Sequence, residues 1–426
     1  MKPMSMTQKI LSRSSNGQYL EKGEFIVADI DLCFAHDPVI GVLVNRFKKN
    51  FGENAKVWDP SKIALFQDHL VPAKNAESAR LLSLMDKFVE DQQIEHFFPF
   101  GSDYGVCHIK MIEAGLTVPG STMIGTDSHT VTAGAFNLFA AGVGVFDMVN
   151  VFKTGDLWFK VPGTIQVDIN GQLPDGVLAK DIILKLVGHL GLDGANGFSL
   201  EFTGDTVENL PIEERVTLCN MAVEAGATNG IMALNDETRE FLRKKSCSIN
   251  QEVETDSDYK YDKVIQLRAE DIESQVALPH RPDNVSPISK VRESRIAIQR
   301  VYVGGCTGGK QEDIINFAKE IKGQKVAKGV EVHIVPATSE IFKYLAESGL
   351  MVELINFGAV VDSPGCKSCY GVHGGVTKDN ENCLATINRN FVGRMGNPKS
   401  NIYLASPIVA SRSAITGYIT DTLELV

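Results

Sequence analysis

The amino-acid sequence predicts an α/β protein with mainly parallel sheets. Three observations lead to this fold class. Apolar, strand-like runs alternate with polar runs of helical periodicity. Glycine, with 38 residues among 426, often stands where a strand-like run gives way to a helical one, and 43% apolar with 22% charged residues is the balance of a globular chain. Strands that alternate with helices are typical of parallel sheets.

The chain length gives a loose expectation of three domains, at roughly 150 residues each. Two shifts in composition suggest where the domains meet. After Lys160-Val-Pro-Gly163 the chain turns to the strand-like run TIQVDI, and the segment 279–287 holds three prolines in nine residues, as linkers do. We therefore predict α/β domains at 1–163, 164–290 and 291–426.

The last third of the chain has the clearest pattern. Its strand-like runs are RIAIQRVYV (295–303), EVHIVPA (331–337) and INFGAVVDS (355–363). Helical runs separate them at 311–321, with apolar residues at 314, 315, 318 and 321, and at 339–348. This β-α-β-α-β order brings each strand-to-helix turn to the carboxyl edge of one sheet, where reactive groups gather.

Three of the eight cysteines lie in these turns. Cys306 is in VGGCTGGKQED, and Cys366 and Cys369 are in DSPGCKSCYG. Because turns at one sheet edge can meet, three thiols can converge, and Cys306 also precedes a helix, whose amide N–H groups favour a thiolate. Eight cysteines are too few for a disulfide scaffold in a chain of this size, so we expect a reducing, cytoplasmic setting.

Three thiolates suit some metal sites better than others. Structural zinc takes four closed ligands, and electron-transfer iron–sulfur clusters usually take four cysteines. Three cysteines on a four-iron cluster leave one iron open to act as a Lewis acid. On spacing alone, a stray CxxC beside an unrelated core cysteine is an equal alternative.

The first of these turns also imitates a nucleotide-binding loop. Gly304 to Lys310 fits the pattern GxxxxGK, and VVD at 360–362 resembles the partner acidic strand. However, Gln311 stands where such a loop needs serine or threonine to hold Mg²⁺. A P-loop nucleotide hydrolase is therefore the disfavoured alternative.

Histidines and carboxylates occur together earlier in the chain. A carboxylate beside an imidazole raises the pKa of the ring and orients it, as a proton donor requires. Taken singly, each such residue is more often structural, but their co-occurrence is informative. The candidates are Asp68 and His69 in QDHL, His108 in GVCH, Asp127 and His129 in GTDSHT, and Glu224 in NMAVEAGATNG.

Near the end, the segment NRNFVGR places Arg389 and Arg394 beside amides, including Asn388, and a glycine. Arginine grips carboxylates bidentately, so the segment is interpreted as a carboxylate-binding loop. A basic surface turn is the alternative reading of its composition.

The charge balance excludes several classes of partner. Acidic residues outnumber basic ones, 53 to 42, for a net charge of −11. Such a chain is a poor binder of nucleic acid and of anionic membranes, and its apolar runs fall short of the ~20 residues of a membrane span. The start, MKPMSMTQKILSR, lacks the apolar core of a secretory signal. We expect no nucleic-acid and no membrane partner.

Together the motifs resemble the aconitase superfamily. They occur in the order QDHL, GVCH, GTDSHT, NMAVEAGA, GGCTGGKQED, GCKSCYG, NRNFVGR and ASPIVA, from about residue 30 to the C-terminus. The length matches the family's stand-alone large subunits, since single-chain members carry a fourth, swivelling domain that does not fit here. The resemblance implies three α/β domains packed around a central [4Fe–4S] cluster ligated by Cys306, Cys366 and Cys369.

The resemblance also implies the reaction and the roles of the other candidates. A hydroxy-di- or tricarboxylate would reversibly lose and regain water, and the pair Asp68–His69 would help to protonate the leaving oxygen. Asp127, His129, His108 and Glu224 match positions that hold the cluster-bound water and the substrate. Substrate-side positions are matched by His36 in FAHDP, Ser128, Asn220, Asn388, Arg389 and Arg394.

One role of the family is missing from this chain. Its carbon base is a serine on the swivelling domain, which a small partner subunit supplies, together with the substrate-specificity loop, where the large subunit stands alone. The branch that interconverts 2- and 3-isopropylmalate in leucine biosynthesis is the leading expectation, with homoaconitate and small alkylmalates as alternatives. Departures at Gly305, Gly308 and Lys367-Ser368 leave that choice open. An RNA-binding form without the cluster is disfavoured by the net charge.

Overall fold

The computed structural model describes residues 2–249 and 251–423, and the contacts of the chain divide it into two compact units. The first unit comprises Met1–Pro99, Met111–Gly171 and Asp193–Leu267, and the second comprises Phe100–Lys110, Gln172–Leu192 and Arg268–Val426. Each unit is described by itself below. The division into domains at 163 and 290 stays a prediction.

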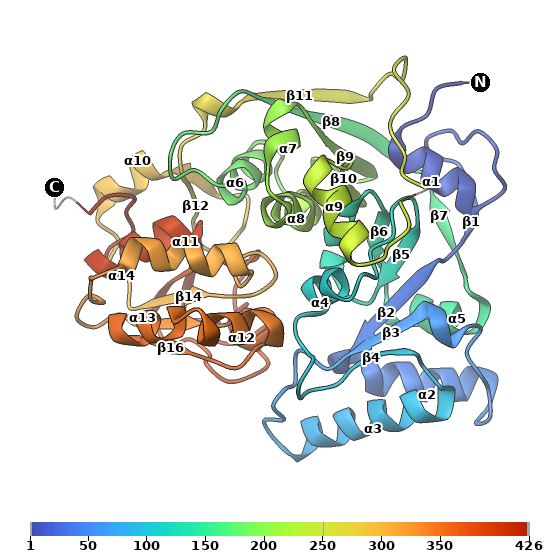
Figure 1. The fold of residues 1–426 in the computed structure, drawn as a ribbon, viewed down its shortest axis with the longest axis horizontal. Coiled ribbons are helices and arrows are strands. Elements are labelled where there is room, and N and C mark those ends of the chain that lie inside the picture. Colours follow the sequence, from blue (N-terminus) through green and yellow to red (C-terminus); the bar gives the residue numbers. More distant parts are fainter. Residues whose placement is uncertain (1, 250, 424–426) are drawn as a thin grey trace. The chain divides into compact units, whose positions relative to one another are not determined.

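A five-stranded parallel sheet is the framework of the first unit (Figure 1). Its order is β4-β3-β2-β5-β6, and each neighbouring pair is parallel. All residues of β2 and β3 are buried, as expected for continuous apolar runs inside a parallel sheet. The strands are β2 (Leu32–His36), β3 (Ile63–Phe66), β4 (His96–Phe98), β5 (Thr122–Gly125) and β6 (Phe139–Gly142), accompanied by α2 (Ile40–Phe51), α3 (Ala76–Gln92) and α5 (Val145–Thr154). Helix α4 (Cys107–Glu113) begins in the second unit and ends in the first.

The first unit holds two further sheets. One has the order β10-β9-β8-β11, in which β8, β9 and β10 run parallel, and the other is the antiparallel pair β1 and β7. The strands are β1 (Phe25–Asp29), β7 (Asp156–Lys160), β8 (Gly163–Asn170), β9 (Phe198–Thr203), β10 (Asn229–Ile231) and β11 (Lys263–Arg268). The helices are α1 (Met6–Ser14), α7 (Asp205–Asn209), α8 (Ile212–Met221) and α9 (Asp236–Lys244), with 3₁₀ turns η3 (Ser128–Phe136) and η4 (Ala222–Ala225).

A seven-stranded sheet is the framework of the second unit. Its order is β13-β12-β18-β17-β14-β15-β16, parallel from β18 to β16 and antiparallel where β12 meets β13 and β18. The strands are β12 (Gln275–Ala277), β13 (Val285–Pro287), β14 (Arg300–Val303), β15 (Glu331–Ile334), β16 (Ala359–Val361), β17 (Asn382–Ala385) and β18 (Asn401–Leu404). The helices are α6 (Ala179–Leu190), α10 (Ile288–Val291), α11 (Gln311–Ile321), α12 (Ser339–Glu347), α13 (Leu350–Phe357) and α14 (Pro407–Thr416).

The predicted β-α-β-α-β order of the last third is confirmed as β14, α11, β15, α12 and β16. Helix α11 has the predicted bounds and buries Ile314, Ala318 and Ile321 as expected. Ile315 is only half-buried, and Phe317 is the fourth buried apolar residue of the helix. Helix α11 packs on α14, and α13 packs on β16 (Figure 1). The turns that carry the cysteines therefore do lie at one sheet edge.

The predicted bounds of all three strands are too wide, and the run 331–337 forms a strand only over Glu331–Ile334. Strand β14 begins at Arg300 rather than at 295, because Arg295 ends a short 3₁₀ turn with a positive φ of 44° and the amide of Ile298 donates to Gly417 O. Residues 355–357 belong to α13, and Gly358, at a φ of 115°, ends that helix before β16. The short segment 355–357, which is apolar except for Asn356, does not distinguish a strand from the end of a helix by its periodicity.

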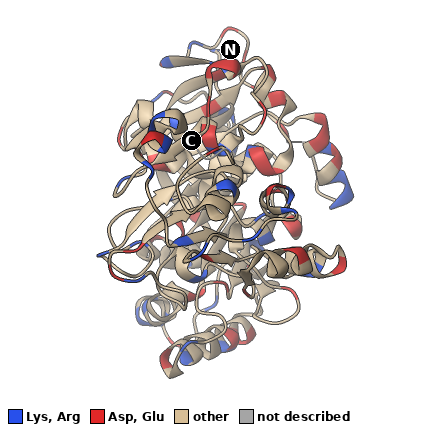
Figure 2. Cartoon of the chain, turned by 90° about the vertical axis from the view of Figure 1, so that its left-hand side faces the viewer, with Lys and Arg blue, Asp and Glu red and all other residues tan. Residues whose placement is uncertain are grey.

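Figure 2 shows basic and acidic residues interspersed along the helices. Among the helices that the structure describes, none combines the length and apolarity that a bilayer span requires.

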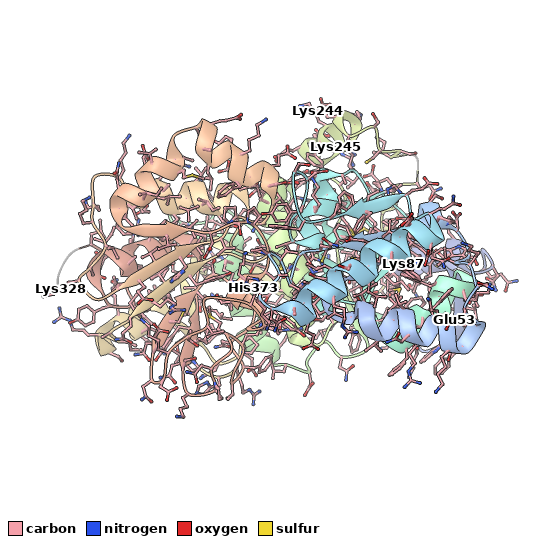
Figure 3. All side chains as sticks on the ribbon, turned by 90° about the horizontal axis from the view of Figure 1, so that it is seen from below. Glu53, Lys87, Lys244, Lys245, Lys328 and His373 are labelled. Carbon is pink, nitrogen blue, oxygen red and sulfur yellow. The ribbon has the colours of Figure 1, made fainter. Side chains whose placement is uncertain are left out.

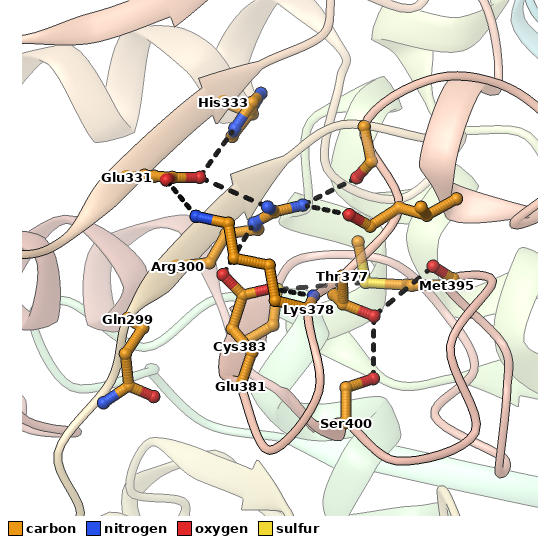
Figure 4. Close-up of polar contacts among 12 residues, drawn as sticks. Gln299, Arg300, Glu331, His333, Thr377, Lys378, Glu381, Cys383, Met395 and Ser400 are labelled. Atoms are coloured by element: carbon orange, nitrogen blue, oxygen red, sulfur yellow. Dashed lines mark hydrogen bonds and ion pairs between the residues drawn. The ribbon is translucent and has the colours of Figure 1, made fainter.

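A buried arginine ties the loop after the CxxC segment to the sheet (Figure 4). Arg300, in β14, is 3% exposed, and its guanidinium donates to Gly375 O at 2.6 Å and to Val376 O at 3.2 Å. Its Nε lies 3.4 Å from Oε1 of Glu381, a carboxylate that is itself buried, and its Nη2 donates to Glu331 Oε2 at 3.2 Å. Residues 375–376 are thus held at the start of β14.

We predict that Arg300→Leu destabilises the fold strongly. The change leaves the buried Glu381 carboxylate without its cation, which typically costs about 3–5 kcal/mol of unfolding free energy. Denaturant unfolding followed by circular dichroism measures the loss. The matched control is Lys87→Met on α3 (Figure 3), because the pair of Lys87 with Asp91 is exposed and such pairs contribute little. Equal effects of the two changes would contradict the assignment.

Candidate functional site

The first unit brings its predicted acid and base residues to one edge of the five-stranded sheet. His36 ends β2, Asp68 and His69 follow β3, and Asp127 follows β5. Strands β3, β2 and β5 are adjacent and parallel, so their carboxyl ends lie side by side. One ligand atom from each of His36, His69 and Asp127 lies within 4.8 Å of the others, so the three groups can face one bound molecule.

The pair Asp68–His69 is buried and closely hydrogen-bonded. His69 Nδ1 lies 2.6 Å from Asp68 Oδ1, and the side chains are 5% and 0% exposed. A third carboxylate, that of Asp37, lies 3.8 Å from the same nitrogen. Asp37 also accepts hydrogen bonds from the backbone amides of His69, at 3.1 Å, and Leu70, at 2.7 Å, so it fixes the turn that carries the pair.

Charge in this cluster shifts two pKa values upward. Burial by itself lowers the pKa of His69, but the carboxylates of Asp68, Asp37 and Asp127 outweigh it and raise that pKa to about 9. Burial, followed by repulsion from Asp68, raises the pKa of Asp37 to about 7. His69 is therefore a cation at neutral pH, hydrogen-bonded on one side of its ring to a carboxylate.

Sequence reasoning missed Asp37. It immediately follows His36 in the motif FAHDP, and a carboxylate directly after a candidate histidine was the available signal. Its 0% exposure and its contacts with the backbone of a residue 32 positions later became evident only in the fold.

His36 and Asp127 complete this edge. His36 Nδ1 lies 2.8 Å from Thr126 Oγ1, and its Nε2 lies 3.8 Å from Asp127 Oδ2. The rings of His36 and His69 meet edge to face, with centroids 4.7 Å apart. Asp127 caps η3 by accepting from the amide of His129 at 2.7 Å, which orients the first turn of that segment, where the half-buried Ser128 also lies.

His129 and Glu224 form a second buried pair. His129 Nε2 lies 2.7 Å from Glu224 Oε1, and the side chains are 5% and 2% exposed. Segment η3 approaches β10 so closely that a Cβ on Gly134 would lie 1.7 Å from Gly230 O, so only glycine fits there. Asn220, on α8, donates to Thr132 Oγ1 at 2.7 Å, in the same segment η3.

The second unit gathers the three cysteines at the carboxyl edge of the seven-stranded sheet. Cys306 follows β14, and Cys366 and Cys369 follow β16, with 5%, 8% and 3% exposure. A Cβ built on Gly305 would lie 3.2 Å from Cys369 Sγ, which places the CxxC segment against the Cys306 turn. Tyr302 OH donates to Cys366 O at 3.2 Å and so holds the backbone of Cys366 to β14.

Two of the sulfur atoms receive hydrogen bonds from the segment NRNFVGR. Asn388 Nδ2 donates to Cys306 Sγ at 3.2 Å, and Arg394 Nη2 lies 3.8 Å from Cys369 Sγ. Both donors follow β17, the neighbour of β14 in the sheet. N–H donors directed at sulfur favour thiolate over thiol.

The remaining candidates of this unit lie nearby in the chain or in space. Arg389 is half-buried beside Asn388. His108 is 4% exposed, and one of its ring nitrogens lies within 4.8 Å of Cys306 Sγ. The segment before it is fixed by hydrogen bonds from Val106 N to Ala337 O and from Ser339 N to Tyr104 O, at the loop that follows β15.

The geometry disfavours the nucleotide-binding reading of 304–310. Lys310 is 2% exposed, and its Nζ lies 2.7 Å from Oδ2 of Asp313, which is also buried. A Cβ on Gly308 would lie 1.8 Å from Thr386 Oγ1, so the turn is closed against the end of β17. A P-loop lysine must reach a phosphate, whereas this one is neutralised inside the protein.

The chain matches one family over most of its length. A sequence profile described as the aconitase family (aconitate hydratase) matches residues 8–417. The 3-isopropylmalate dehydratase large subunit 1 of Methanopyrus kandleri is 43% identical over 417 residues, 98% of either chain. The 3-isopropylmalate dehydratase large subunits of Moorella thermoacetica, 41% identical over 99% of either chain, and of Caldicellulosiruptor bescii, 40% identical over 100% of this chain and 98% of that one, are similar to it as well.

A solved structure agrees with the fold. The crystal structure of Thermococcus kodakaraensis aconitase X in its holo-form aligns over 93% of this chain and 87% of that chain, with a TM-score of 0.52 and 12% sequence identity. At that identity the likeness supports the predicted aconitase-like α/β fold and nothing finer. With the profile spanning 8–417 and relatives above 40% identity over nearly the whole chain, the protein belongs to the aconitase family.

Proposed function

We propose that this chain is the large subunit of a [4Fe–4S] hydro-lyase that interconverts 2- and 3-isopropylmalate in leucine biosynthesis. The observation that carries the proposal is the group of three buried thiols at one sheet edge, two of which receive hydrogen bonds from Asn388 and Arg394. The names of the relatives at about 40% identity supply the substrate. The buried thiols suit a reducing cytoplasm.

The donor set fits an iron–sulfur cluster. Cys306, Cys366 and Cys369 would ligate it. Such clusters are bound by cysteine sulfur atoms that accept hydrogen bonds from nearby N–H groups. Three protein ligands suit a catalytic rather than an electron-transfer cluster. When bound, the cluster supplies a Lewis-acidic iron for the hydroxyl and a carboxylate of the substrate.

His69 is the proposed proton donor of the chain. Asp68 holds Nδ1 of the ring, so Nε2 carries the proton that can be transferred to a leaving hydroxyl group. Because the pKa of His69 is about 9, the ring is protonated at neutral pH and can donate its proton to the departing oxygen. Asp37 supports the pair by fixing its backbone.

The other polar groups orient water and substrate in this proposal. The pairs His129–Glu224 and His36–Asp127, with His108, would hold a water molecule and the substrate hydroxyl by hydrogen bonds. The guanidinium groups of Arg389 and Arg394 would bind substrate carboxylates, since arginine offers a planar fork to them. Asn388, Asn220 and Ser128 would complete the substrate side.

A small partner subunit is part of the proposal. It would supply the serine that removes the carbon-bound proton and the loop that selects the substrate side chain. Homoaconitate and methylmalate or 2,3-dimethylmalate remain the alternative substrates, because the selecting loop is not in this chain. A P-loop hydrolase is the alternative of another class, and the buried Lys310–Asp313 pair disfavours it.

We predict that Cys306→Ser abolishes the cluster. Anaerobically reconstituted wild-type chain should be brown, with iron–sulfur absorption and about four irons per chain. The variant loses one of three ligands and should be nearly colourless. Cys247→Ser, at a half-buried thiol of the first unit, is the control and should load fully. Colourless wild-type protein, or a loaded Cys306→Ser variant, would refute the cluster assignment.

Turnover should require two chains. The reconstituted protein alone is expected not to dehydrate 3-isopropylmalate, because the carbon base is absent. The absorbance of the alkene product measures the reaction. Addition of a small subunit should restore activity, with 3-isopropylmalate preferred to homoaconitate and methylmalate. Full activity of the single chain would contradict the partner, and a reversed preference would contradict the substrate.

The ionisation of His69 gives a pH prediction. Its folded pKa of about 9 lies above its ordinary value of 6.5, so the stability that the ion pair contributes is complete below pH 6.5 and is lost as the pH rises through 9. NMR titration of labelled histidine should show a midpoint near 9, lowered in Asp68→Asn. Asp91→Asn, at an exposed carboxylate of α3, should leave it unchanged. A wild-type midpoint at or below 6.5 would overturn the prediction.

A further inference from the structure

Lys180 is a buried cation of the second unit that has no role in the proposed mechanism. Lys180 lies in the first turn of α6 and is 2% exposed. Its ammonium donates three hydrogen bonds, to Thr307 Oγ1 at 3.1 Å, Thr386 O at 2.9 Å and Ile387 O at 2.6 Å. An ammonium group has three donors, so these neutral oxygens account for all of them.

The position of these acceptors is informative. Thr307 directly follows Cys306, and Ile387 directly precedes Asn388, whose amide donates to Cys306 Sγ at 3.2 Å. Thr307 Oγ1 also donates to Thr386 O at 2.9 Å. One ammonium group therefore joins the turn that carries a proposed cluster ligand to the loop that carries its hydrogen-bond donor.

The charge of Lys180 requires a partner that its hydrogen bonds do not include. A buried ammonium is strongly disfavoured unless negative charge lies close by. The neighbouring Lys310 already has the carboxylate of Asp313 at 2.7 Å, so these three groups together carry one positive charge in excess. Burial, and then repulsion from Lys310, lower the pKa of Lys180 to about 7, while Asp313, Cys306 and Cys369 act in the opposite direction.

We infer that Lys180 is a positioning residue and the buried counter-cation of the anionic cluster. The inference rests on the proposed function, since it is the cluster and its three thiolates that supply the missing negative charge. By joining Thr307 to the backbone carbonyl before Asn388, the ammonium would keep the Asn388 amide within hydrogen-bond distance of Cys306 Sγ. By its charge, it would stabilise the more negative, reduced form of the cluster.

The test compares reconstituted wild-type protein with Lys180→Met, which keeps the length of the side chain and removes its charge and donors. We expect the variant to bind iron about 10–100-fold less tightly in competition with a chelator, as is typical when a group that hydrogen-bonds around a metal ligand is removed. We also expect the midpoint potential of the protein-bound cluster, measured by EPR-monitored titration, to shift to a more negative value. Both readouts are independent of turnover.

Lys185→Met is the matched control. Lys185 lies on the same helix, but its ammonium is bonded to Asp271 O near the surface, so its removal should change neither iron binding nor potential. Circular dichroism of the apo forms checks folding. Should Lys180→Met fail to fold, Lys180→Gln supplies the same comparison, because it removes the charge and keeps a donor.

The outcomes separate the two proposals. A wild-type chain that binds no cluster defeats the proposed function and with it the inference. A wild-type chain that binds the cluster, beside a Lys180 variant of unchanged potential, overturns the inference alone, whether or not the variant binds iron less tightly. A more negative potential in the Lys180 variant and not in Lys185→Met supports it.

Discussion

Compensation of buried charge is the constraint on which the second unit depends. Three buried thiols follow β14 and β16 at one edge of the sheet, and a cluster held there would concentrate negative charge where water has little access. Hydrogen-bond donors and cations surround these thiols and can compensate that charge. Asn388 and Arg394 reach two sulfurs, and Lys180 stands behind the Cys306 turn. The glycines allow this because their missing side chains let the loops approach.

The first unit solves the opposite problem. Asp37, Asp68 and Asp127 bring three carboxylates toward one imidazole, and the balance raises the pKa of His69 to about 9 and that of Asp37 to about 7. The cation and the surplus acid are complementary, since each makes the burial of the other tolerable. A parallel sheet makes such a cluster possible because the loops after adjacent strands meet at one edge.

Much of this arrangement could be predicted from the sequence, because strand and helix patterns in the last third specify which turns share an edge. That rule brought the turns of the three cysteines to one sheet edge. The pair Asp68–His69 and the segment NRNFVGR were predicted instead from residue type and motif resemblance, the segment as a carboxylate-binding loop. Helix α13 was missed, because its last three residues, 355–357, were assigned to the strand that follows it. Lys180 gave no local signal, because its acceptor Thr386 O lies 206 residues away. Long-range electrostatic partners of this kind appear only once the chain is folded.

The interleaving of the two units has a consequence for biosynthesis. The segments of each unit alternate along the chain, and α6 belongs to the unit whose sheet is completed only by β18. On the ribosome the ammonium of Lys180 therefore stays hydrated while some two hundred further residues are made, because its acceptors do not yet exist. The turns that carry the three cysteines and the segment after β17 can come together only when translation has nearly ended. If the chain binds the proposed cluster, the cluster can be inserted only after translation, because the order of the segments along the chain delays the assembly of its ligands.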